Sequence, residues 1–205
     1  MNRLKFQKSL NTLKGWRERA FLLALAERAF PNALLYIENL DTENVDAESP
    51  SKVLLKRSHL DQAWQALIMD QDEDGIVSLL DITAAHMPKL ENNEHYGALP
   101  THDCLHILEQ ALLAGINDEK PRALSASQSS LETITQFIEF SEGDQLSENQ
   151  LVKLFDSHPL IEREFSFQSE ISDLLRSATH PGEELVAVIR ELAQDEGVSN
   201  IGISL

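Results

Sequence analysis

The chain has 205 residues, of which 42% are hydrophobic and 25% are charged, as in ordinary soluble globular proteins. Its 34 acidic residues outnumber its 17 basic ones, and the net charge of −17 argues against nucleic-acid binding, which requires a basic surface. The length allows one domain or two small ones. Because no long linker and no fixed-period repeat is visible, we expect a single compact all-α domain over residues 1–205.

Apolar residues recur with helical spacing through nearly the whole chain, whereas alternating strand patterns are absent. Helices are predicted over residues 2–13 and 16–29. A third is predicted from Pro31 to about residue 40, because proline suits the first turn of a helix. After an acidic loop, further helices are predicted over about 49–69 and 76–87.

The second half of the chain predicts the remaining helices, for a total of about eight or nine. One runs from Pro100 to a C-cap at Gly115, and another covers 121–140. Ser147 and Gln150 form a capping-box pattern that begins a short helix to about residue 156. Helices over 159–178 and from 181 to a stop at 197 follow, and the tail 199–205 is expected to be extended and docked. The inward face expected for the last helix is Leu185, Val188, Ile189 and Leu192.

The single cysteine, Cys104, excludes an intrachain disulfide and a multi-cysteine zinc site, which agrees with a reducing compartment. Basic residues near the start precede an apolar run over 21–26 that is too short for a signal sequence or a membrane span. We therefore expect an unprocessed cytoplasmic protein with no membrane partner.

Residues 70–81 match the ligand spacing of an EF-hand calcium loop, with Gly75 at position 6, where the loop turns sharply. Carboxylates fill positions 1, 3 and 5, a backbone carbonyl would serve at position 7, and a hydroxyl could bind through water at position 9. Position 12 carries an aspartate in place of the usual glutamate. The candidate Ca²⁺ or Mg²⁺ ligands are therefore Asp70, Asp72, Asp74, Ile76, Ser78 and Asp81.

A simpler interpretation of residues 70–81 is an acidic loop before a helix, whose positive dipole end favours carboxylates. EF-hands usually occur in pairs, and the sequence has no good second loop.

His102, His106 and Glu109 share one side of the helix predicted after Pro100, at i, i+4 and i+7. Two imidazoles and a carboxylate can hold a divalent transition metal, as in a metal-dependent enzyme. The apolar face of this helix includes Cys104 and points elsewhere. The histidines are therefore expected to face solvent or a partner, and the thiol to be buried and inert.

The sequence contains no phosphate-binding loop, nucleophile elbow or zinc-protease motif. The remaining conspicuous side chains have structural interpretations. Trp16, Trp64 and Tyr96 are expected to anchor the core, and the glutamates at 162, 164 and 170 are expected to be solvated.

Several short segments occur in a characteristic order along the chain: Trp16, then Glu27-Arg28 and Pro31-Asn32, then Tyr96-Gly97 with Pro100 and Asp103, and finally Ser-Asn-Ile-Gly-Ile at 199–203. This ordered set resembles the bacterial YjaG family, whose domain is one of unknown function, number 416. The resemblance spans almost the whole chain and implies a cytoplasmic, all-helical protein without an established activity, cofactor or catalytic residue. It also implies an association with histidine-kinase signalling, through gene neighbourhood alone.

We therefore expect a non-enzymatic interaction or regulatory protein that has a protein partner or associates with itself as a dimer. The first alternative is a Ca²⁺/Mg²⁺-binding EF-hand-like module at residues 70–81. The second is a metal-dependent enzyme around His102, His106 and Glu109.

Overall fold

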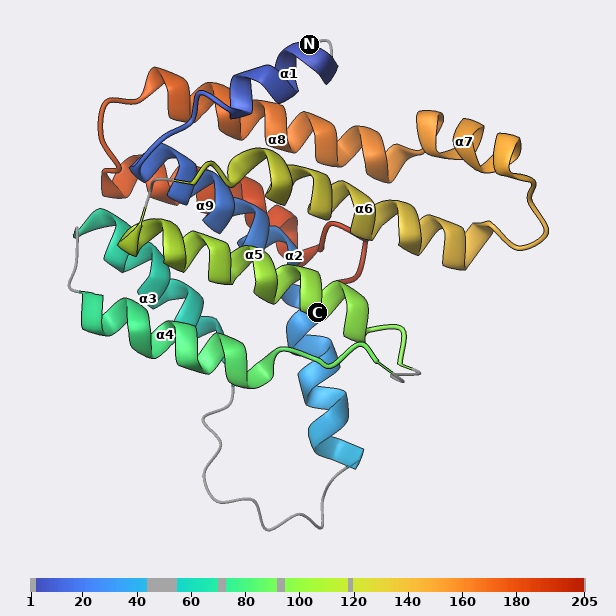
Figure 1. The fold of residues 1–205 in the computed structure, drawn as a ribbon, viewed down its shortest axis with the longest axis horizontal. Helices are drawn as coiled ribbons and strands as arrows, with labels where there is room; N and C mark the ends of the chain where they lie inside the picture. The colour runs from blue at the N-terminus through green and yellow to red at the C-terminus, as the bar shows by residue number, and fades with distance from the viewer. Residues whose placement is uncertain (1–2, 44–54, 70–72, 92–94, 118–119, 205) are drawn as a thin grey trace.

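The computed structural model describes residues 3–43, 55–69, 73–91, 95–117 and 120–204. Over these ranges the chain forms nine α-helices, which confirms the all-α fold class (Figure 1). In chain order they are α1 (Arg3–Leu10), α2 (Trp16–Glu43), α3 (Arg57–Ile68), α4 (Glu73–His86), α5 (Ala98–Ile116), α6 (Ala123–Glu142), α7 (Glu148–Ser157), α8 (Pro159–Ser177) and α9 (Glu183–Gln194). A 3₁₀ turn, Asp195–Gly197, precedes a C-terminal turn that is closed by an antiparallel bridge between Val198 and Ser204.

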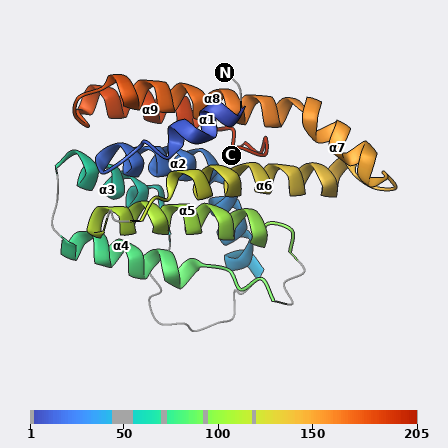
Figure 2. The ribbon, with the colours of Figure 1, turned by 45° about the horizontal axis from the view of Figure 1, so that its top comes forward.

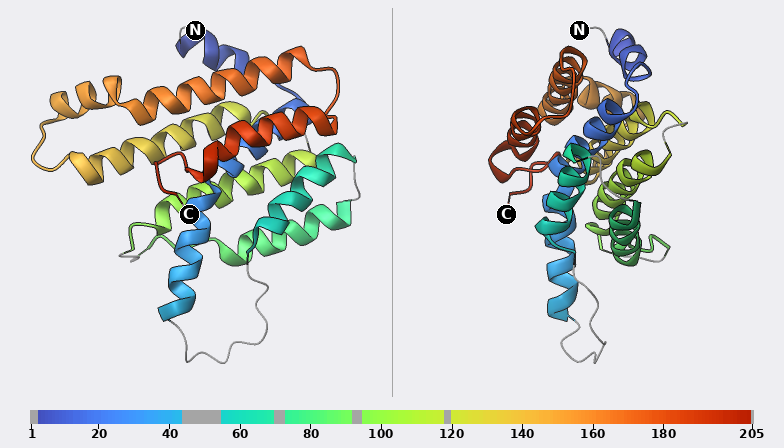
Figure 3. Two further views of the ribbon diagram at one scale, coloured as in Figure 1. Left: turned by 180° about the vertical axis from the view of Figure 1, so that it is seen from behind. Right: turned by 90° about the vertical axis from the view of Figure 1, so that its left-hand side faces the viewer.

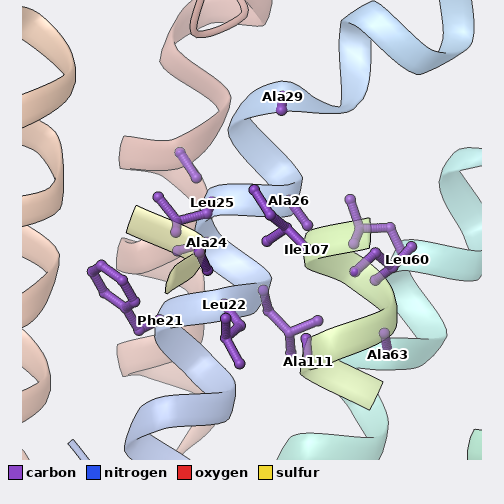
Figure 4. Packing of buried hydrophobic residues seen from close by; sticks show 14 of the residues in the cluster. Phe21, Leu22, Ala24, Leu25, Ala26, Ala29, Leu60, Ala63, Ile107 and Ala111 are labelled. Atoms are coloured by element: carbon purple, nitrogen blue, oxygen red, sulfur yellow. The ribbon is translucent and has the colours of Figure 1, made fainter. Parts of the chain in front are cut away.

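Helix α2 runs through the centre of the molecule and contacts α3, α5, α6, α8 and α9 (Figure 2). Residues 20–26 are all buried, so this part of the helix is enclosed on every side. Figure 4 shows Leu22 and Ala26 of α2 close to Ile107 and Ala111 of α5. The main hydrophobic cluster draws residues from every helix except α7.

The prediction of a helix boundary at Pro31 is wrong, because α2 continues through the proline to Glu43. Proline removes the hydrogen bond to the carbonyl of residue 27 and bends a helix there. Phe30 and Ala33 are both fully buried, so packing on each side of the proline holds the chain helical. The second half of α2 consequently leaves the direction of the first half (Figures 1 and 3).

By length and composition alone, the stretch Trp16–Leu40 of α2 would suffice to cross a membrane. However, 89% of its most apolar window is buried inside the protein. A core helix of a globular protein meets the same criterion, so this stretch is weak evidence for a membrane span.

Two further predictions about helices need correction. Gly115 is not a C-cap, because α5 ends at Ile116 with Asn117 as its cap. A Cβ atom at Gly115 would lie 2.9 Å from Cζ of Arg19, so this glycine makes room for a buried arginine. On α9, Ile189 is buried as expected, but Val188 is 45% exposed. The fully buried residues of α9 are Val186, Ile189 and Ala193, while Leu185 and Leu192 pack partly buried against the core, as predicted.

A second, smaller hydrophobic cluster joins α6 and α8 to the C-terminal turn through Ile134, Ile138, Ile161 and Ile201. The capping box of Ser147 and Gln150 is present and begins α7, as predicted. Helix α7 has no buried residue and lies at the far end of the α6–α8 layer (Figures 1 and 3).

Candidate functional site

The EF-hand pattern falls partly on helix. Asp70 and Asp72 lie outside the described residues, and α4 already begins at Glu73. Gly75, which an EF-hand loop uses for its sharp turn, lies in the first turns of α4. The remaining candidate ligands, Asp74, Ile76, Ser78 and Asp81, lie on the same helix. The described part therefore lacks EF-hand loop geometry, and metal binding stays a prediction for experiment.

The histidine constellation does not converge on one site. The His102 and His106 rings lie 6.2 Å apart, centroid to centroid, on α5. Each ring pairs with its own carboxylate: His102 Nδ1 lies 3.5 Å from Asp103 Oδ1, and His106 Nδ1 lies 3.4 Å from Glu109 Oε2. Within the described ranges, no cluster of three or more His, Cys, Asp or Glu side chains is placed to hold a metal ion. A cavity between α5 and the start of α6 is lined by His106 but not by His102 or Glu109.

Cys104 is fully buried in α5, as expected, and its Sγ lies 3.6 Å from the Ala26 carbonyl oxygen. Burial, followed by the negative charge of Asp103, raises the pKa of the thiol. A thiol with a raised pKa is a poor nucleophile at neutral pH, so Cys104 is a packing residue.

Buried ion pairs along α2 are the features that sequence reasoning missed. The Glu27 carboxylate is completely buried. Its Oε2 accepts a hydrogen bond from Trp64 Nε1 at 2.7 Å, and its Oε1 accepts one from Gln194 Nε2 at 2.9 Å. Arg57 also pairs with Glu27, and Arg190 Nε lies 3.4 Å from it. One carboxylate thereby joins α2 to α3 and α9.

The next residue, Arg28, makes a second buried pair, with its Nε 2.9 Å from Glu164 Oε2 on α8. The other carboxylate oxygen of Glu164 accepts hydrogen bonds from Ser130 at 2.7 Å and from Gln168 at 2.8 Å. Arg28 also lies 3.3 Å from Asp195, next to the C-terminal turn. The prediction that Glu164 is solvated is therefore wrong, because this side chain completes a buried network.

One turn further along α2, Asn32 ties the helix to the C-terminal turn. Its Nδ2 donates a hydrogen bond to Asn200 Oδ1 at 2.9 Å. The buried Thr101 of α5 lies with its hydroxyl 3.4 Å from the Asn32 carbonyl oxygen. The turn itself is closed by a bond from the Ser199 amide to the Ile203 carbonyl at 2.8 Å. Three chain segments that are distant in sequence are thus fixed against one another.

A pocket of about 290 Å³ opens where these segments meet. It lies between the second half of α2, the residues before and at the start of α5, and the C-terminal turn. We call it the apolar pocket. Its lining is Asn32, Leu35, Tyr36, Asn39, Leu40, His95, Tyr96, Gly97, Pro100, Ile201 and Ile203.

The lining includes much of the ordered set on which the family resemblance rests, namely Asn32, Tyr96-Gly97, Pro100 and part of 199–203. These residues are far apart in the sequence and share no single element. Their meeting at one pocket makes it the candidate functional site, since ligand sites are commonly concave and mostly apolar.

Aromatic rings form part of the pocket wall. The Tyr96 ring stacks on Phe140 of α6, with centroids 4.3 Å apart and planes inclined by 22°. Gly97 allows the Tyr36 ring to lie close to the backbone, because a Cβ atom there would be 3.1 Å from Tyr36 Cδ2. Burial, followed by the charge of Asp103, raises the pKa of Tyr96 to about 12.

Two oxygen atoms at this wall, Asn32 Oδ1 and Tyr96 Oη, are buried without a hydrogen-bond partner among the described residues. Neither is accessible to water, so neither presents a polar contact at the pocket surface. No Asp, Glu, Lys or Arg belongs to the lining of this pocket in the described parts of the chain. The arrangement thus provides shape and mainly apolar contact, with His95, Tyr36 and Tyr96 as its titratable side chains.

The family model described as "Protein of unknown function (DUF416)" matches residues 5–204 of this chain. The chain is 25% identical over 196 residues to the uncharacterized protein YjaG of Salmonella typhimurium, covering 95% of this chain and 94% of that protein. It is 27% identical over 199 residues to an uncharacterized protein of Haemophilus influenzae, covering 96% and 95% of the two chains.

The fold is similar to that of the crystal structure of a DUF416 family protein from Shewanella baltica. That comparison has a TM-score of 0.77 and 25% identity, and it covers 98% of each chain. The chain therefore belongs to the DUF416 family of proteins of unknown function.

Proposed function

We propose that this protein is non-enzymatic and acts by binding a small molecule in the apolar pocket. The observation that carries this proposal is the pocket of about 290 Å³ lined by three chain segments that buried hydrogen bonds hold together. A preformed concave site of mainly apolar and aromatic lining is typical of small-molecule binding.

The lining favours binding over catalysis. General acid–base or nucleophilic catalysis requires titratable side chains held at the reacting atoms. In the described lining, the titratable groups are His95, Tyr36 and Tyr96, and burial raises the pKa of Tyr96 still further above neutral pH. The pocket is therefore better suited to holding a molecule than to transforming it.

A regulatory effect would follow from where the pocket lies. A bound molecule would contact α2 and the C-terminal turn at once, near Ile201 and Ile203. Any ligand that binds only the folded form stabilises it by RT ln(1 + L/Kd), where L is the free ligand concentration. Occupancy would therefore strengthen the contact of this turn with the body of the protein. The expectations of a protein partner, of self-association and of a cytoplasmic, signalling-associated role stay predictions.

The proposal is tested by a comparison of pocket variants. The protein is incubated with a small-molecule extract of bacterial cells, separated rapidly by size exclusion, and its retained compounds are identified by mass spectrometry. Leu35→Trp places a large ring in the pocket, whereas Val188→Trp adds the same ring on the exposed face of α9.

We expect at least one compound to be retained by the native protein and by Val188→Trp but lost from Leu35→Trp. The proposal is contradicted when no compound shows this pattern.

A further inference from the structure

We infer that the apolar pocket selects uncharged molecules of one or two rings and rejects anions of the same shape. This inference rests on the proposed function and names the ligand class of that same site.

The size of the pocket limits its ligand. A volume of about 290 Å³ lies at the lower end of known ligand pockets, which span roughly 300–1,000 Å³. An engineered cavity of about 150 Å³ accommodates benzene, so the space here suits one or two rings with a short substituent.

The chemical character of the walls disfavours an anionic ligand. The lining includes the apolar and aromatic side chains of Leu35, Tyr36, Tyr96, Pro100, Ile201 and Ile203, beside the uncharged amides of Asn32 and Asn39 and the imidazole of His95. A charge that leaves water for such a site without an opposite charge pays a large desolvation cost. The part of the lining that the structure describes contains no lysine or arginine to offset that cost for an anion.

The negative charge of the protein also disfavours an anionic ligand. The chain carries a net charge of −17. Asp103, which disfavours ionisation of Tyr96, contributes negative potential from the first turns of α5. The negative charge of Asp103 would also act against an anion bound beside Tyr96.

Aromatic walls favour a flat ligand. Tyr36 and Tyr96 both line the pocket, and the Tyr96 ring also stacks on Phe140. A fixed ring gains from offset stacking or edge contacts with a second ring, beyond the apolar area buried.

The test compares benzyl alcohol and benzoate, which share one ring and differ in charge. Each is titrated into ¹⁵N-labelled native protein at pH 7, and the backbone amide signals of Tyr96, Gly97 and Ile203 are followed by NMR. We expect benzyl alcohol to shift these signals saturably, and benzoate to bind at least about tenfold more weakly, a difference of about 1.4 kcal/mol.

A charge variant gives a matched control. Ile203→Arg places a cation at the pocket wall, and Val188→Arg places one on the exposed face of α9. We expect the first variant to gain benzoate binding by about tenfold relative to benzyl alcohol, and the second to behave as the native protein.

The outcomes separate the two claims. Benzoate binding to the native protein as tightly as benzyl alcohol overturns the ligand class but leaves the pocket a binding site. The absence of any shift at Tyr96, Gly97 and Ile203 with both probes overturns the proposed function as well. The comparison on the native protein decides both points even when Ile203→Arg does not fold.

Discussion

The buried pair between Arg28 and Glu164 provides the sharpest stability prediction. Both side chains are nearly fully buried, at 3% and 1% exposure, and Glu164 also accepts hydrogen bonds from Ser130 and Gln168. Glu164→Leu leaves the Arg28 guanidinium buried with Asp195 at 3.3 Å as its remaining carboxylate. Breaking a buried pair by removing one partner costs about 3–5 kcal/mol, so we expect a loss of that size.

The measurement is urea unfolding at pH 7, followed by the helical circular dichroism signal. The matched control is Glu162→Leu, which makes the same change at an exposed position of α8 and is expected to alter stability by less than about 0.5 kcal/mol. For a protein of this length, each kcal/mol corresponds to roughly 2–4 °C in Tm, so thermal unfolding provides a second readout.

The double variant Arg28→Leu/Glu164→Leu separates the pair from its surroundings. Because neither charge is then left unpaired, we expect its destabilisation to be smaller than the sum of the single variants by about 2 kcal/mol. A loss below about 1 kcal/mol for Glu164→Leu, or strict additivity in the cycle, would refute the buried ion pair.

Other predictions follow from single observations. Calorimetric titration of chelator-treated protein with Ca²⁺ tests the EF-hand hypothesis. Because Gly75 and Asp81 lie on α4, we expect no saturable binding tighter than about 10⁻⁴ M; one-site binding lost in Asp74→Ala would support the hypothesis. Since folding raises the pKa of Tyr96 to about 12 from 10.0, its contribution to stability is complete below pH 10 and is lost as the pH rises to about 12. Tyr96→Phe should therefore flatten the plot of the free energy of unfolding against pH between pH 10 and about 12. An unchanged slope of that plot would contradict the prediction. Glu18 Oε1 accepts hydrogen bonds from the Arg122 amide at 2.5 Å and the Ala123 amide at 2.9 Å, so it caps α6 from another helix. Glu18→Ala should lower the free energy of unfolding by about 1–3 kcal/mol in urea titration, and a change below about 0.5 kcal/mol would show that the cap is dispensable.

The fold class and most helices follow from the periodicity of the sequence, because amphipathic helices in a globular protein must bury one face. The capping box of Ser147 and Gln150 can also be recognised in the sequence, because it is a local pattern of two residues three positions apart. The predicted helix boundary at Pro31 is wrong, because the long-range packing of Phe30 and Ala33 stabilises a continuous α2 on both sides of the proline. The predicted C-cap at Gly115 is wrong for a similar reason, because this glycine leaves room for the side chain of Arg19 on α2.

The sequence does carry a signal for the buried charges of α2. Glu27 and Arg28 interrupt a stretch of α2 that is otherwise nearly all apolar, and charged residues at such positions are almost never buried without partners. Which residues pair with them could not be read from the sequence, but the burial of one partner could. On α8, Glu164 lies three and seven positions before Phe167 and Ile171, so the helical period places it on the buried face, whereas Glu162 and Glu170 lie off that face.

The apolar pocket could be predicted only in part. The resemblance identified the segments around Asn32, Tyr96-Gly97 and Ile201, but no periodicity indicates that they meet in space. Their meeting depends on the bend of α2 and on the hydrogen bond from Asn32 to Asn200, which are tertiary features.

The most direct test of the binding proposal is a crystal structure of the native protein soaked with benzyl alcohol. The account predicts the ring between Leu35, Tyr96 and Ile203, with its hydroxyl towards solvent. An unoccupied pocket at saturating probe, or the probe bound only elsewhere on the molecule, would contradict the assignment of this pocket as the functional site.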